Sequence, residues 1–180
     1  PLVWADHYPG IPGGRHNSDI TGLMSIDISH GLIPSLPLND MTNGEKLPIM
    51  ALSGCHPLQL DVSFMNLLTD TQNALYQSTW VFESLGWWLT RLEGGGTIAT
   101  LGPAGLGYGY IGAYGTEGLG GWLWPEFFRQ YSQEGKDILG ETFSQTLNSY
   151  INTFGPRMDQ SDSKTVEEMI LLGDPTLQIG

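Results

Sequence analysis

The chain has 180 residues, of which 40% are hydrophobic and 14% charged, with a formal net charge of -12 and one cysteine. This length suits a single well-buried domain, and the apolar content is too high for an intrinsically disordered protein. The acidic surface would repel a phosphate backbone, which argues against nucleic acid as a partner, and no apolar run is long enough to predict a membrane span.

Residues 1–22 are expected to form an irregular N-terminal segment, because proline, glycine, asparagine and aspartate dominate its sequence. A short apolar, β-favouring run at 23–29 predicts the first strand, and the apolar run at 47–53 predicts a second, buried strand. We assign residues 23–180 to one domain. The opening residues carry no signal-peptide pattern and do not resemble a natural initiation site, so we expect the chain to be part of a longer protein.

A helix and a third strand are expected in the middle of the chain. Apolar residues recur at helical spacing over 78–93, and three glycines at 94–96 end this helix. The run that follows, at 97–102, predicts the third strand. The glycine- and tyrosine-rich segment at 103–122 is too long for a simple connector, and long ordered loops of this kind usually line a site.

The last third of the chain is expected to hold further helices and a closing strand. A helix is predicted to begin near Trp124, with Pro125 in its first turn, and an apolar stripe at helical spacing runs over 139–150. Residues 155–164 predict a polar break, and the apolar run at 169–173 predicts a strand before a Gly-Asp-Pro turn. This alternation of strands and helices is typical of an α/β fold, in which helices cover the faces of a sheet.

Two of the predicted strands end in residues that carry chemistry. His30 and Gly31 follow the first strand, and Cys55 follows Gly54 at the end of the second. The carboxyl ends of neighbouring parallel strands share one edge of a sheet, where an imidazole can activate a thiol and the amides of Gly31 and Cys55 can bind an oxyanion. A lone cysteine in an apolar context is also explained as a small buried hydrophobe, and the pattern alone leaves both interpretations open.

The order of these segments resembles the gingipain-type (C25) cysteine peptidases, which belong to the caspase-like peptidases. Besides the His-Gly and Gly-Cys blocks, the stretch ESLGWWLTRLEGGGTIATLGPAG is similar to their glutamate-containing helix, glycine turn and strand, and MILLGDPTLQI is similar to their closing motif. The resemblance runs from about residue 22 to the end. It implies a caspase-like fold with a mostly parallel sheet flanked by helices, and a secreted or cell-surface protein that acts on peptides or proteins. The upstream half of such a domain has no counterpart here, so another segment of the same precursor is expected to complete it.

Carried over residue by residue, the resemblance implies a cysteine endopeptidase with Cys55 as the nucleophile and His30 as the general acid and base. The amides of Gly31 and Cys55 would form the oxyanion hole. The loop at 103–122 would form a wall of the pocket for the side chain that precedes the scissile bond. Its candidate substrate-binding residues are Tyr108, Tyr110 and Tyr114.

The remaining polar residues receive no catalytic role. Adjacent residues of an extended chain point to opposite sides, so we interpret His56 as a loop residue beside the nucleophile. No metal-ligand motif is present and the chemistry requires no cofactor, although the acidic composition and the family are compatible with a structural calcium ion. The charge balance favours a basic residue before the cleaved bond. The alternative function is a non-catalytic caspase-like domain of a secreted or cell-surface protein, and a caspase-like hydrolase of another specificity also stays open.

Overall fold

The computed structural model describes residues 43–63, 65–72, 84–110 and 112–179. The N-terminal segment at 1–22 and the predicted strand at 23–29 lie outside these residues, as does the first part of the predicted helix at 78–93.

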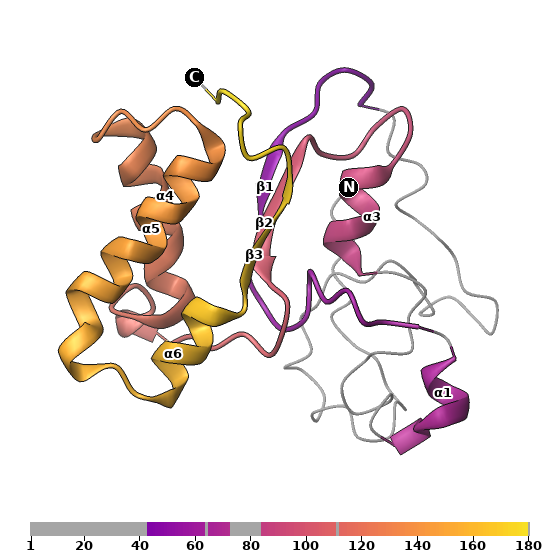
Figure 1. Cartoon of the computed structure of the whole chain (residues 1–180), viewed down its shortest axis with the longest axis horizontal. Coiled ribbons are helices and arrows are strands. Elements are labelled where there is room, and N and C mark those ends of the chain that lie inside the picture. The colour runs from indigo at the N-terminus through magenta and orange to yellow at the C-terminus, as the bar shows by residue number, and fades with distance from the viewer. Residues whose placement is uncertain (1–42, 64, 73–83, 111, 180) are drawn as a thin grey trace.

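The described part of the chain forms one three-stranded sheet in the order β1-β2-β3, which Figure 1 shows at the centre of the molecule. β1 (Ile49–Ala51) runs parallel to β2 (Ala99–Pro103). β3 (Met169–Gly173) runs antiparallel to β2. These strands confirm the three apolar runs in this part of the chain as strands, each within one or two residues of its predicted ends.

The described sheet is mixed rather than mostly parallel, and the cause is the place where the chain enters β3. The Ala104 N–H donates to the Glu168 carbonyl at 2.8 Å, so the residue before β3 lies beside the end of β2. From there the chain can only run back along β2, and Met169 consequently pairs with Pro103.

Helices cover both faces of the sheet (Figure 1). α3 (Leu85–Arg91) lies on one face, while α4 (Leu119–Ser132), α5 (Leu139–Phe154) and α6 (Gln160–Glu167) lie on the other. The shorter elements of the described residues are α1 (Asn66–Thr69), η3 (Gly112–Tyr114) and η4 (Gly155–Arg157). The predicted α/β fold, with helices on the faces of a sheet, is confirmed for this part of the chain.

β2 is buried along its whole length because its side chains alternate between two apolar clusters. Leu101 packs with Phe127 of α4 and Leu139 of α5. On the opposite face, a Cβ at Gly102 would lie 2.8 Å from Leu58, which belongs to the cluster formed with α3. This packing fixes the carboxyl ends of β1 and β2, where the candidate site lies.

α4 begins earlier than predicted, and its proline therefore does not lie in the first turn. The helix starts at Leu119, so Pro125 lies inside it. The glycines of its first turn suggested a loop, but they allow close packing that a side chain would prevent. A Cβ at Gly121 would lie 1.8 Å from the Gly115 carbonyl oxygen. Tertiary packing here outweighs the low helix propensity of glycine.

α6 lies where the sequence indicates a polar break, so this part of the prediction is wrong. Thr165 is its only buried residue, which leaves no apolar stripe for the sequence to reveal. The helix is defined instead by a capping box, in which the Asp159 side chain accepts from the Asp162 N–H and the Asp162 side chain accepts from the Asp159 N–H. The pattern Asp-x-x-Asp is the signal from which it could have been predicted. None of the described helices is long and apolar enough to cross a membrane.

Candidate active site

Cys55 lies just beyond the carboxyl end of β1, where the chain is held against the continuation of β2. The His56 N–H donates to the Gly105 carbonyl at 2.7 Å, and the Cys55 Sγ donates to the Gly107 carbonyl at 3.6 Å. The thiol is exposed. This exposure overturns the interpretation of Cys55 as a small buried hydrophobe.

Two glycines bring the backbone of the following loop against the cysteine. Gly54 has a φ of 120°, a conformation that favours glycine. A Cβ at Gly107 would lie 2.2 Å from the Gly54 carbonyl oxygen, so only glycine fits at this crossing. No hydrogen bond within the described part of the chain uses the Cys55 N–H. Among the described residues, this amide therefore has no acceptor that would compete with a ligand beside the thiol.

His56 adopts the left-handed conformation, with a φ of 64°, and its side chain is half-buried. Burial lowers the pKa of His56, and the charge of Lys164 lowers it further. The Gln59 side chain and the charge of Asp61 act in the opposite direction. His56 Nδ1 and Gln59 Oε1 are buried and have no hydrogen-bond partner in the described structure. The neutral imidazole is favoured.

His30 and Gly31, the predicted base and the predicted second oxyanion-hole residue, lie outside the described residues. Their positions beside Cys55 remain predictions.

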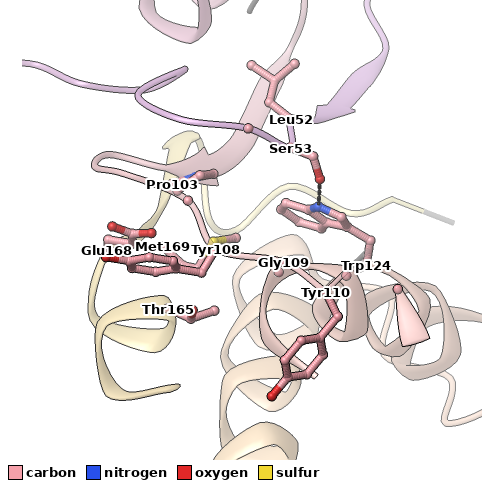
Figure 2. Close-up of a pocket in the computed structure, with 15 residues that line it drawn as sticks. Leu52, Ser53, Pro103, Tyr108, Gly109, Tyr110, Trp124, Thr165, Glu168 and Met169 are labelled. Atoms are coloured by element: carbon pink, nitrogen blue, oxygen red, sulfur yellow. Dashed lines mark hydrogen bonds between the residues drawn. The ribbon is translucent and has the colours of Figure 1, made fainter. Parts of the chain in front are cut away.

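A cavity of about 270 Å³ opens beside the cysteine, at the carboxyl ends of β1 and β2 (Figure 2). Ser53 and Gly54 contribute one part of its lining and Gly107 another. The Trp124 Nε1–H of α4 donates to the Ser53 Oγ at 2.7 Å, which ties the residues before Cys55 to the helix. The cavity therefore shares its wall with the segment that carries the thiol.

Two of the three candidate tyrosines line this cavity. Tyr108 and Tyr110 are among its lining residues and are 38% and 52% exposed, whereas Tyr114 is 63% exposed and lies outside the lining. The Tyr110 ring packs over Gly118, where a Cβ would approach it to 2.9 Å. In Figure 2 this ring extends away from Trp124 and Ser53. Tyr108 is the tyrosine that faces the polar end of the cavity.

That polar end is formed by the last turn of α6 and the residue before β3. Glu168 and Thr165 line it, and Figure 2 shows Glu168 next to Tyr108. The Lys164 ammonium donates to Glu168 Oε2 and, at 2.8 Å, to the Leu106 carbonyl. Burial raises the pKa of Glu168, while the hydrogen bond and charge of Lys164 oppose this shift.

The opposite end of the loop is anchored by Tyr150 of α5. Its hydroxyl accepts from the Leu119 N–H at 2.9 Å and donates to Asp162 Oδ1 at 2.5 Å. The Gly120 N–H then donates to the Tyr108 carbonyl at 3.1 Å. One buried phenol thus links the start of α4, the cap of α6 and the loop that lines the cavity.

The family model described as peptidase family C25 matches residues 17–180, nearly the whole chain. The chain belongs to peptidase family C25. No curated protein and no solved structure matches it. Membership confirms the resemblance drawn from the His-Gly, Gly-Cys and closing Gly-Asp-Pro blocks. It indicates a cysteine peptidase that acts on proteins.

Several residues of this candidate site could not be predicted from the sequence. Trp124 was expected only to begin a helix, and α6, which carries Lys164 and Thr165, was not predicted at all. Glu168 directly precedes an apolar strand, and no periodic signal marks it.

Within the described residues, no cluster of three or more His, Cys, Asp or Glu side chains is arranged to hold a metal ion. A structural calcium site therefore remains a prediction.

Proposed function

We propose that this C25 family member is a cysteine endopeptidase with Cys55 as its nucleophile. The observation that carries the proposal is the exposed thiol just beyond the carboxyl end of β1, next to Gly54, which lines the cavity. A nucleophilic cysteine must be accessible, whereas a structural one is normally buried and inert. We further propose the caspase-like fold that membership of the family implies.

In the proposed reaction the Cys55 thiolate attacks the scissile carbonyl carbon, and the carbonyl oxygen becomes an oxyanion. His30 takes the thiol proton and delivers it to the leaving amine, which departs as the C–N bond breaks. The resulting acyl-enzyme is hydrolysed by a water molecule that His30 deprotonates, which restores the thiol. No cofactor enters these steps.

The amides of Cys55 and Gly31 are proposed to bind the oxyanion. The Cys55 N–H suits this role because it has no hydrogen-bond acceptor in the described part of the chain. A preorganised donor of this kind is worth about 10²–10³ in rate in serine peptidases.

The cavity beside Cys55 is proposed to hold the substrate side chain that precedes the scissile bond. Tyr108 and Tyr110 line it and would pack against that side chain, while Tyr114 would contact the substrate outside the cavity. We propose a secreted or cell-surface location for the protein. We also propose that another segment of the same precursor completes the domain.

The proposal is tested by the reactivity of Cys55 toward iodoacetamide and a peptidyl acyloxymethyl ketone at neutral pH, followed by intact mass. We expect the peptidyl ketone to label Cys55 selectively, and both Cys55→Ala and His30→Ala to abolish that selectivity. His56→Ala is the matched control, because His56 adjoins the nucleophile without a proposed role in proton transfer. Labelling no faster than that of an ordinary thiol would refute the nucleophile.

A further inference from the structure

We infer that the cavity beside Cys55 selects an uncharged amide side chain, glutamine or asparagine, immediately before the cleaved bond. The inference rests on the proposed function, since it assigns a substrate class to the same site. This specificity differs from the one that the acidic composition of the chain predicts, which is a basic residue before the cleaved bond.

The cavity adjoins the nucleophile closely enough to take the side chain next to the scissile carbonyl. Gly54, which precedes Cys55, lines it, and so does Gly107, whose carbonyl accepts from the Cys55 Sγ. A side chain that enters the cavity therefore belongs to a residue whose backbone lies at the thiol.

Among the described residues, the one carboxylate that lines the cavity is paired with an ammonium group. Glu168 is the single acidic or basic residue in its described lining, and its side chain is only 9% exposed. Lys164 forms an ion pair with Glu168 Oε2 one helical turn away. The carboxylate and the ammonium cancel, so a substrate cation gains no net charge attraction from this pair.

Lys164 is fixed in this position by more than the ion pair. Its ammonium also donates to the Leu106 carbonyl at 2.8 Å and lies 5.0 Å from the centre of the Tyr108 ring. Three partners on different segments hold the ammonium in place. A lysine or arginine of the substrate would have to displace this ammonium or remain near a like charge in a partly buried site, which is unfavourable.

Two hydrogen-bonding groups on residues that line the cavity have no partner among the described residues. The Thr165 hydroxyl is buried, with the residue 2% exposed, and its Oγ1 has no partner in the described structure. Glu168 Oε1 accepts no hydrogen bond from a described residue. A buried polar group without a partner is unfavourable, so a ligand that pairs with the threonine gains free energy.

A primary amide offers a hydrogen-bond partner to each of these groups. Its NH₂ can donate to Glu168 Oε1, and its carbonyl can accept from the Thr165 hydroxyl. A substrate carboxylate would face Glu168 without a donor, and an aliphatic side chain would leave both groups unpaired. The apolar sides of Met169 and Trp124, which also line the cavity, suit the methylene groups of the side chain.

The test uses the 180-residue chain and peptidyl acyloxymethyl ketones that differ only in the residue next to the reactive carbon: Gln, Asn, Lys, Arg or Leu. Second-order rates of Cys55 labelling are divided by the rate with iodoacetamide. We expect Gln or Asn to exceed Lys, Arg and Leu by about tenfold, which corresponds to one hydrogen bond to a charged group.

The variant Lys164→Met releases the Glu168 charge, so it should shift the preference toward Lys and Arg by about tenfold. Lys136→Met is the matched control, because Lys136 pairs with Glu141 on the surface and lies outside the cavity lining. Circular dichroism verifies that both variants are folded.

The outcomes separate the two proposals. If no peptidyl ketone labels Cys55 more selectively than iodoacetamide, the proposed function is overturned. Selective labelling in which Lys or Arg equals or exceeds Gln and Asn overturns the amide preference and leaves the peptidase intact. If Lys164→Met leaves a preference for Gln or Asn unchanged, the ion pair between Lys164 and Glu168 is not the cause of that preference.

Discussion

Replacing Gly107 with alanine should disable the candidate site while leaving most of the fold in place. The new Cβ would lie 2.2 Å from the Gly54 carbonyl oxygen and 3.0 Å from its carbonyl carbon. Carbon and oxygen atoms in contact normally lie about 3.3 Å apart, so the two backbones must separate by about 1 Å. The backbone at Gly107 has no positive φ, and the effect therefore arises from this contact alone.

The size of the effect follows from where the displacement falls. Gly54 precedes Cys55, and a misplacement of about 1 Å at a reacting group lowers the rate about 10²-fold. Overpacking costs about 1–3 kcal/mol in the free energy of unfolding. For a chain of this length each kcal/mol lowers the melting temperature by about 2–4 °C.

The matched control is Gly109→Ala, on the same loop and also in the cavity lining. A Cβ at Gly109 has no atom within 4 Å, and its φ is not positive. We would measure the rate of Cys55 labelling by a peptidyl ketone and the melting temperature of both variants. If Gly107→Ala reacted as fast as Gly109→Ala, the close approach of the loop would not position the nucleophile.

Two further predictions concern stability. Tyr150→Phe leaves the Leu119 N–H without its partner and should lower the free energy of unfolding, measured by urea titration, by about 1–3 kcal/mol. The control is Tyr131→Phe, at a partly exposed ring, which should change this free energy by less than about 0.5 kcal/mol. Equal losses in both variants would contradict the network. Burial lowers the pKa of His56 in the folded state, so the unfolded state binds a proton first as the pH falls. The neutral, buried imidazole therefore contributes its full stability above about pH 6.5, and that stability is lost as the pH falls through the folded pKa. His56→Gln should make the decline in unfolding free energy from pH 7 to 5 shallower, and an unchanged slope would refute the burial of this imidazole.

The strands of the described sheet could be predicted because each is a short apolar run with glycine or proline near its end. The predicted place of Cys55 at a strand end follows from the same pattern, since β1 ends three residues before Gly54. α5 could also be predicted from the sequence, because its buried residues recur at helical spacing from Leu139 to Tyr150.

Other elements could not be predicted because their signals lie in tertiary contacts. The first turn of α4 contains two adjacent glycines, which local propensity assigns to a loop. They are helical because Gly121 packs directly against the Gly115 carbonyl. α6 has a polar sequence with one buried residue, so its amphipathic pattern is weak.

The sequence by itself determined the family, the apolar strands and the candidate nucleophile, because these depend on local order and on residue types that only certain chemistry requires. Tertiary structure decided that the Cys55 thiol is exposed and that a cavity lies beside it. It also decided that Glu168 forms an ion pair with Lys164 at the end of that cavity. Glu168 reaches the cavity beside Cys55 only because β3 runs back along β2, which brings the end of α6 to the sheet edge where β1 and β2 end.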